Sequence, residues 1–288
     1  MRVEDYPAQE PLTERGVEYT ERYLAKSAAV GGHEAFYGDH PCQSLLVCPS
    51  ERPDGRVLAF MYGGGWTNGY KELMAFMAPA FNAAGVTFVS IGYRLAPEFV
   101  FPEGWLDSAR AVGWIHDNIA RLGGDPTKLF VGGWSAGGHY ASLLATRRDW
   151  QGAQGVPRDV IRGCVTMTGI FDFTPGNGMS VRPRFLGPVE AAYDVPASPL
   201  FNLDAPAPPF LLTFGSDDFP HLALQSRKFA AVAAAKGVDV ELHEIAGRSH
   251  FTLPDAGGEA DGPWVPLVLD WMDRHSKAYA SRARVGQR

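Results

Sequence analysis

The chain has 288 residues, of which 45% are hydrophobic and 20% charged, a composition that excludes extended disorder and predicts a large buried core. The formal charge of −6, without a basic stripe interleaved with aromatic residues, argues against nucleic acid as a partner. Residues 1–10 lack the pattern of a secretory leader, and no stretch approaches the roughly 18 apolar residues that span a bilayer. We therefore expect a cytoplasmic protein without a membrane partner.

The cysteines and histidines do not form a recognisable metal motif. Three cysteines (Cys42, Cys48 and Cys164) cannot close a set of disulfides, and their spacing matches no zinc pattern. The segment 33–40 holds two histidines but lacks tight ligand spacing. We expect no metal and no cofactor.

Segments of strand length alternate with longer segments of helical periodicity. The first half is predicted to contain, in chain order, a strand at 43–48, a strand at 56–62, a helix at 70–84, a strand at 86–93, a helix at 104–122, a strand at 128–133 and a helix at 136–147. The second half is predicted to contain a strand at 161–168, a strand at 210–214, a helix at 219–236, a strand at 238–245 and a helix at 264–282. Gly85 and Gly237 follow their helices where a left-handed glycine commonly ends a helix.

Most of these strands are continuous apolar segments rather than alternating ones. This pattern predicts an α/β fold with a mostly parallel, open sheet of about eight strands that helices cover on both faces. We expect one domain over residues 1–288, with an N-terminal segment at 1–40. Residues 171–205 break the alternation and are rich in proline and glycine, which is typical of a lid-like insertion.

A serine stands at the junction of a predicted strand and a predicted helix, in the pattern Gly133-x-Ser135-x-Gly137. Such a sharp turn exposes the serine hydroxyl, and the flanking glycines remove Cβ atoms that would clash. The next helix begins with free N–H groups, notably that of Ala136, which would face a developing oxyanion. The alternative is an ordinary turn with a solvent-facing serine.

A second glycine-rich turn follows the strand at 56–62, with the sequence Tyr62-Gly-Gly-Gly-Trp66. Three consecutive glycines are entropically unfavourable to order, so they make sense where backbone N–H groups must approach a ligand closely. We expect Gly63 and Gly64 to donate to the oxyanion together with Ala136, whereas the alternative is a plain flexible turn.

A base and an acid follow at the ends of later strands. His250 comes after the strand at 238–245, and Asp217 and Asp218 end the strand at 210–214. Carboxyl ends of parallel strands are where ligands meet such sheets, and nucleophile, acid, base is the order of this fold. We favour Asp218 over Asp217 as the acid, because adjacent strand residues point to opposite sides. Asp217 is then expected to cap the helix near 219.

These motifs together resemble the α/β-hydrolase superfamily, and within it the arylformamidase (kynurenine formamidase) and hormone-sensitive-lipase-like esterase groups. The elbow Gly132-Gly-Trp-Ser-Ala-Gly-Gly-His139 and the segment Tyr93-Arg-Leu-Ala-Pro-Glu98 are similar to theirs. The likeness covers roughly residues 40–275. It implies an α/β-hydrolase fold and a metal-free serine hydrolase with the triad Ser135, Asp218 and His250.

One position departs from the families' pattern, since Tyr62 stands where they usually have histidine. Tyr62 is expected either to hold the glycine loop or to reach the acyl pocket. Trp66 and Trp134 flank the expected site and favour an apolar substrate, and His221 is a further candidate contact. Core packing is the alternative for Trp134.

Two functions follow from this sequence. The first is hydrolysis of a small carboxylic ester or an aryl amide such as an N-formyl arylamine, through an acyl-enzyme. The second is ligand sensing on the same fold with little turnover, since a fold does not fix a function. We also consider a homodimer, in which an exposed edge strand or the last helix would pair with its copy in the second chain.

Overall fold

The computed structural model describes residues 2–179, 181–204 and 206–285. Within them, the centre is an eight-stranded sheet in the order β1-β2-β4-β3-β5-β6-β7-β8. The first two strands pair antiparallel, β1 with β2 and β2 with β4, and all further pairs are parallel. The predicted mostly parallel, open sheet is confirmed. The strands are β1 (His33–Phe36), β2 (Ser44–Cys48), β3 (Gly55–Met61), β4 (Thr87–Ile91), β5 (Gly124–Trp134), β6 (Ile161–Met167), β7 (Phe210–Asp217) and β8 (Val240–Ser249).

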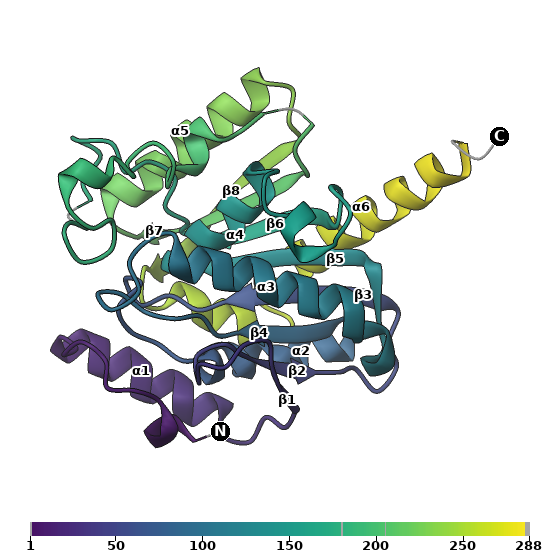
Figure 1. Cartoon of the computed structure of the whole chain (residues 1–288). Coiled ribbons are helices and arrows are strands. Elements are labelled where there is room, and N and C mark those ends of the chain that lie inside the picture. Colours follow the sequence, from purple (N-terminus) through teal and green to yellow (C-terminus); the bar gives the residue numbers. More distant parts are fainter. Residues whose placement is uncertain (1, 180, 205, 286–288) are drawn as a thin grey trace.

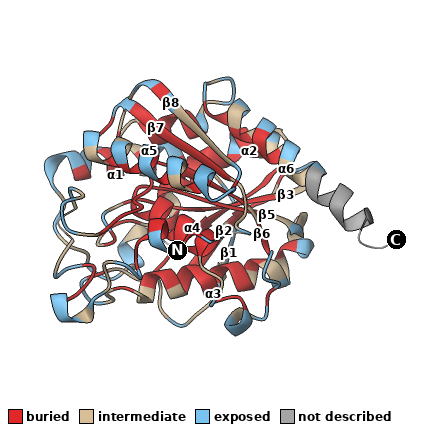
Figure 2. Ribbon diagram, turned by 90° about the horizontal axis from the view of Figure 1, so that it is seen from above, coloured by how far each residue is buried: buried red, intermediate tan, exposed pale blue. Residues whose placement is uncertain are grey.

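Helices cover both faces of this sheet (Figure 1). They are α1 (Glu14–Ser27), α2 (Ala78–Ala83), α3 (Glu103–Asn118), α4 (Ala136–Thr146), α5 (Pro220–Ala235) and α6 (Val265–Val285). In the view from above, α3 and α4 pack together on one side of the central strands, and α2 and α6 contact each other on the other side (Figure 2). Because both faces are covered, every residue of β4 is buried, as a continuous apolar strand requires.

Some elements differ from their predicted form. The predicted helix at 70–84 is a 3-10 helix, Lys71–Met77, followed by the short helix α2, which has a proline in its first turn. Proline lacks an N–H and fits only the start of a helix, so a new α-helix begins at this point. Strands β7 and β8 extend past their predicted ends, because Asp217 still pairs with Ser249 beyond a shift in register after Gly215.

The N-terminal segment contains two elements that the periodicity did not predict, α1 and β1. Helix α1 begins at Thr13, whose Oγ1 accepts a hydrogen bond from the Gly16 amide. It buries Tyr19 and Tyr23, both of which pack edge-on against Trp134. The N-terminal segment therefore lies over the end of β5, next to Ser135.

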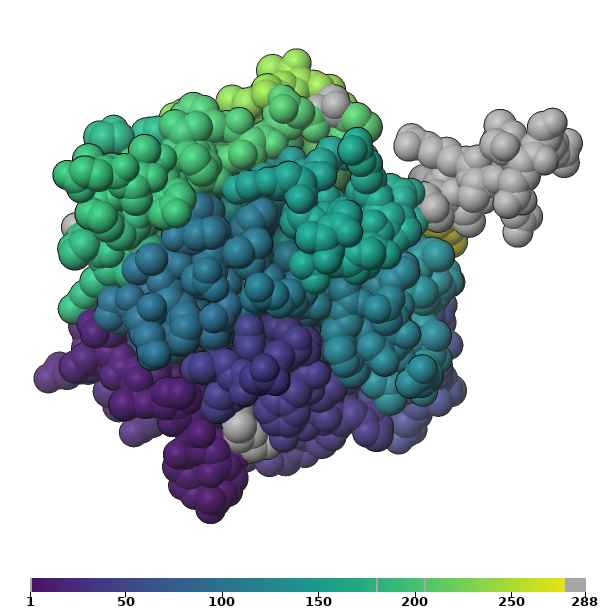
Figure 3. Space-filling model, viewed as in Figure 1, coloured from purple at the N-terminus to yellow at the C-terminus, as the bar shows by residue number. Residues whose placement is uncertain are grey.

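Residues 168–209 join β6 to β7 and contain the short 3-10 helices Val189–Ala191 and Pro199–Phe201. They meet the N-terminal residues on one face of the molecule, where Arg184 pairs with Glu10 (Figure 3). Within the described residues, no helix is both long enough and apolar enough to cross a bilayer. The described part of the chain also contains no group of three or more metal-ligating side chains.

Candidate active site

Ser135 occupies a strained turn between β5 and α4. Its φ of 53° and ψ of −117° are unfavourable for a residue with a Cβ, at a cost of about 1–3 kcal/mol. The neighbouring glycines make the turn sterically possible: a Cβ on Gly133 would lie 2.3 Å from the Gly137 carbonyl carbon, and one on Gly137 would lie 2.1 Å from the Met61 oxygen. The predicted elbow is thus a close approach of three backbone segments.

The structure brings together the three residues expected to form a triad. His250 Nε2 lies 3.0 Å from Ser135 Oγ, and His250 Nδ1 lies 3.1 Å from Asp218 Oδ1. They follow the parallel strands β5, β7 and β8 at the carboxyl edge of the sheet, where β7 and β8 are neighbours and β6 lies between β5 and β7. Each is 9% exposed or less, so their mutual interactions are only weakly screened by solvent.

Three donors surround the carboxylate of Asp218. Besides His250, the hydroxyl of Thr168 donates to Oδ2 at 2.5 Å, and the amide of Phe219 donates to Oδ1 at 2.7 Å. Burial alone would raise the pKa of Asp218, but the hydrogen bond and charge of His250, together with these two donors, hold that pKa below its usual value. The acid is therefore an ionised, oriented carboxylate.

Thr168 is a contributor that the sequence did not reveal. It follows β6 with a φ of 47°, and its amide donates to the carbonyl of Thr213 on β7. Its only sequence signal is its place at the carboxyl end of a strand. The distance to Asp218 depends on the pairing of β6 with β7, which is a non-local contact.

Asp217 does not have the capping role expected for it. Its side chain is exposed and accepts a hydrogen bond from Ser216 Oγ at 3.2 Å, while α5 begins at Pro220 and its N-cap residue Phe219 forms no side-chain cap. The amide of Phe219 is instead bound by Asp218, which comes next after the strand and points inward. The two carboxylates thus face different environments, but not through the predicted alternation, because Ser216 and Asp217 at the end of β7 are both exposed and Asp218 lies just beyond the strand.

The glycine loop after β3 faces the triad. Gly64, Gly65 and Trp66 all have left-handed backbone conformations, with φ of 140°, 62° and 65°. Gly64 and Gly65 line the cavity beside Ser135, whereas Gly63 does not. A Cβ on Gly63 would lie 2.6 Å from the Trp134 ring, so Gly63 permits close packing against the elbow.

Backbone amides without a hydrogen-bond partner in the described part of the chain lie at this cavity, in Gly64 and Gly65, and next to it, in Ala136, which follows Ser135. Within the described residues, the amides of Gly64, Gly65 and Ala136 form no hydrogen bond. Ala136 is the first residue of α4, where an amide has no partner within the helix. Sequence reasoning named Gly64 and Ala136 but missed Gly65, since three identical glycines give no sign of which amides face inward.

Tyr62 lies outside the cavity, so its expected reach into the acyl pocket is wrong. Its ring stacks on Tyr93 at 4.3 Å between centroids, and its hydroxyl donates to the Tyr93 carbonyl at 3.2 Å. The hydroxyl of Tyr93 donates in turn to the Tyr62 carbonyl at 2.8 Å. Burial raises the pKa of Tyr62, which keeps the hydroxyl a neutral donor. Tyr62 therefore holds the base of the glycine loop.

The cavity beside Ser135 has a volume of about 290 Å³ and mostly apolar walls. Trp66, Trp134 and His221 line it, as expected of substrate contacts. Helix α1 adds Tyr19, and the segment after β6 adds Met179. Neither of these two was predicted, because each comes from a region without a motif.

His139, one turn after Ser135, connects the glycine loop to the segment after β6. Trp66 Nε1 donates to His139 Nδ1 at 3.1 Å, so the proton resides on Nε2, which donates to the Ala197 carbonyl at 2.7 Å. Burial lowers the pKa of His139 to about 3, although the bond to Ala197 opposes this shift. The imidazole is therefore neutral and structural.

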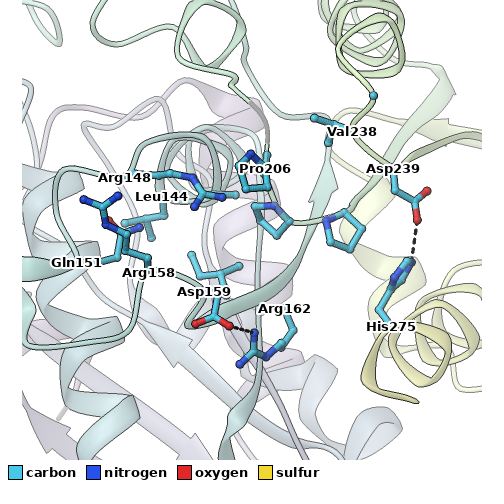
Figure 4. Close-up of a pocket in the computed structure, with 16 residues that line it drawn as sticks. Leu144, Arg148, Gln151, Arg158, Asp159, Arg162, Pro206, Val238, Asp239 and His275 are labelled. Atoms are coloured by element: carbon cyan, nitrogen blue, oxygen red, sulfur yellow. Dashed lines mark hydrogen bonds and ion pairs between the residues drawn. The ribbon is translucent and has the colours of Figure 1, made fainter. Parts of the chain in front are cut away.

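A larger cavity, of about 590 Å³, lies at the opposite end of the sheet, by the amino ends of β6, β7 and β8 (Figure 4). Ion pairs join Asp159 to Arg162 at 3.0 Å and His275 to Asp239 at 3.9 Å across its lining. Among the described residues that line it, none is serine, threonine or cysteine. The described lining of this cavity therefore holds no hydroxyl or thiol nucleophile comparable with Ser135.

Several known proteins resemble this chain in sequence. Esterase LipC of Mycobacterium tuberculosis is 30% identical over 269 residues, which cover 86% of this chain and 66% of LipC. Carboxylesterase NlhH of the same species is 40% identical over 99 residues, which cover 34% of this chain and 31% of NlhH. Across such relatives the match spans between 31% and 66% of their own length.

Solved structures show the same fold at low sequence identity. Esterase B from Lactobacillus rhamnosis superposes with a TM-score of 0.76 at 20% identity, covering 93% of this chain and 95% of that one. The thermophilic carboxylesterase EstE1, cloned from a metagenomic library, superposes with a TM-score of 0.70 at 22% identity, covering 89% and 93%. A family model described as the alpha/beta hydrolase fold matches residues 58–253. Since this match extends from β3 to just past His250, over more than half of the chain, the protein belongs to the α/β-hydrolase family.

Proposed function

We propose that the protein is a serine hydrolase that cleaves small carboxylic esters through an acyl-enzyme. The observation that carries this proposal is the hydrogen-bonded series Ser135, His250, Asp218 at the wall of an apolar cavity. The relatives named as esterases and carboxylesterases support the same reaction class. No step requires a metal or a cofactor.

The triad side chains and the backbone amides have distinct roles in the proposed reaction. His250 Nε2 accepts the proton of Ser135 as its Oγ attacks the ester carbonyl, and Asp218 stabilises the imidazolium that forms. The amides of Gly64, Gly65 and Ala136 donate to the oxyanion. His250 then protonates the departing alcohol oxygen, and a water molecule attacks the acyl-enzyme by the same route. We propose Gly65 in place of Gly63, because Gly65 lines the cavity.

The walls of the cavity suit an apolar acyl or alkoxy group, which Trp66 and Trp134 would contact. Residues 171–205 contribute Met179, and we propose that they act as the lid of a single domain. An N-formyl arylamine could enter the same cavity and pass through the same tetrahedral intermediate. Ester cleavage is the primary proposal because the named relatives are esterases.

Turnover of p-nitrophenyl acetate and butyrate by the wild type and Ser135→Ala tests this function. We expect the variant to lose on the order of 10⁴-fold in kcat, with unchanged circular dichroism. Wild-type turnover by Ser135→Ala would overturn the mechanism. Hydrolysis of N-formylaniline measured alongside compares amide with ester, and tight binding without product release would favour the sensing alternative.

A further inference from the structure

The glycine loop, residues 63–69, is conformationally strained. Besides Gly64, Gly65 and Trp66, Gly69 has a φ of 125°, and a Cβ there would lie 2.3 Å from the Tyr62 ring. A left-handed conformation is unfavourable for Trp66, which has a Cβ. Within the loop, the amides of Thr67 and Asn68 both donate to the Gly64 carbonyl, at 3.2 and 3.0 Å. A loop of this kind needs contacts from outside to keep one shape.

Residues 6–10, which we call the N-terminal strap, supply such contacts. Gln9 Nε2 donates to the Gly69 carbonyl at 2.9 Å, and the Gly69 amide donates to Gln9 Oε1 at 2.8 Å. Asn68 Nδ2 donates to the backbone carbonyl of Glu10 at 2.6 Å. The side-chain amide of Gln9 thus pairs with Gly69 in the way that a neighbouring strand would, by one donor and one acceptor.

The N-terminal strap is itself fixed at both ends. Tyr6 donates to Glu72 Oε2 at 2.9 Å and accepts a hydrogen bond from the buried Lys71 ammonium at 2.6 Å. At the other end, Glu10 pairs with Arg184 of the segment after β6 at 2.9 Å. The two hydrogen bonds of the Gln9 side chain therefore attach the glycine loop to a segment that has contacts at both of its ends.

We propose that Gln9 is a positioning residue, which holds the glycine loop so that the amides of Gly64 and Gly65 face the oxyanion. This inference rests on the proposed ester hydrolysis. Oxyanion donors are effective because their positions are set before the reaction, so even a small shift of the loop weakens transition-state binding more than substrate binding. Gln9 touches no substrate; it acts through Gly69.

The test compares Gln9→Ala and Gln9→Glu with the wild type. Gln9→Glu keeps the acceptor for the Gly69 amide and replaces the donor to the Gly69 carbonyl with an oxygen. Active sites are counted by titration with an alkyl fluorophosphonate. We expect kcat per site to fall about tenfold in Gln9→Ala, with KM changed by less than about twofold. The affinity for an alkyl trifluoromethyl ketone, which forms a tetrahedral adduct on Ser135, should fall by a similar factor.

Arg2→Ala is the matched control, because Arg2 lies in the same N-terminal region and pairs with Glu4 and Asp5 on the surface. It should keep the wild-type kcat per site. Wild-type kcat and ketone affinity in folded Gln9→Ala would overturn the inference and leave the proposed hydrolysis intact. A lower melting temperature or a smaller number of active sites in Gln9→Ala, with kcat per site unchanged, would show that Gln9 only stabilises the fold. That result would also overturn the inference. If Gln9→Ala does not fold, Gln9→Glu decides by the same readouts, and a wild type without ester turnover would instead refute the function.

Discussion

Asp217 and Asp218 are adjacent carboxylates with opposite environments at the end of β7. Asp218 accepts hydrogen bonds from Thr168, Phe219 and His250 and is 9% exposed, while Asp217 faces solvent. The neighbours of Asp218 favour its ionised form. Its negative charge therefore lies next to the ring of His250, where an imidazolium would form. A comparison of the two residues therefore separates the effect of a carboxylate's position from the effect of its chemistry.

We predict that Asp218→Asn lowers kcat by about 10⁴-fold, because an amide neither stabilises the imidazolium nor fixes the required tautomer. Asp217→Asn should leave kcat within about twofold of the wild type, as expected of a surface residue away from the reacting atoms. Steady-state hydrolysis of p-nitrophenyl butyrate measures both. Equal losses in the two variants would refute the choice of Asp218.

Ser135 and its flanking glycines could be predicted from the sequence because their role depends on the local geometry of the backbone. Gly133, Ser135 and Gly137 form a recognisable turn because close approach excludes side chains at fixed spacing. Thr168 and Gln9 could not be found this way, since their partners lie 50 and 60 residues away in the chain. Neither residue belongs to a motif, so only the folded register reveals their contacts.

At the scale of elements, His139 joins three parts of the site. It stands on α4, accepts from Trp66 of the glycine loop, and donates to Ala197 of the segment after β6. Its buried imidazole is neutral at neutral pH, with a single ring proton on Nε2, because burial lowers its pKa to about 3. The packing of these elements therefore depends on a histidine that must stay neutral.

This dependence predicts a pH effect on stability. The pKa of His139 is about 3 in the folded chain and ordinarily 6.5, so between these values the unfolded chain binds more protons. The free energy of unfolding should then fall as pH decreases below 6.5, by up to about 1.4 kcal/mol per pH unit from this group. His139→Gln can keep both hydrogen bonds without titrating. It should show a smaller slope in urea unfolding between pH 4.5 and 7.

The control for this experiment is His33→Gln on the exposed strand β1, which replaces a solvated imidazole and should retain the wild-type slope. Acidic residues common to all variants cancel in the comparison. An unchanged slope in His139→Gln would mean that the imidazole is protonated without penalty in the folded chain.

Most strands and helices were predicted from their periodicity, whereas α1 and β1 were missed. The charged residues of α1 dominate its sequence, and its stability comes from packing Tyr19 and Tyr23 against Trp134. Strand β1 has four residues and exists through its pairing with β2. Strand β1 thus depends on a tertiary contact, whereas α1 does carry local signals that were overlooked in the sequence, namely the Thr13 cap and the helical spacing of its buried Tyr19 and Tyr23.

At the scale of the whole molecule, buried polar groups join distant segments behind the site. Asp107 on α3 is fully buried and accepts two side-chain hydrogen bonds from Arg94, at 2.7 and 2.8 Å. It also accepts from Gln43 at 2.7 Å and from Arg110 at 2.8 Å. This network links the segment after β4, the segment before β2 and α3.

Removing Asp107 should destabilise the entire fold, because it leaves the mostly buried guanidinium of Arg94 without its main partner. We predict that Asp107→Ala lowers the free energy of unfolding in urea by about 3–5 kcal/mol. Asp270→Ala is the matched control, since Asp270 pairs with Arg274 on the surface of α6, and it should change stability by about 0.5 kcal/mol or less. Similar losses in both variants would show that burial does not distinguish these two ion pairs. A large loss in Asp107→Ala alone would identify the buried network as a principal tie between α3 and the strands that carry the site.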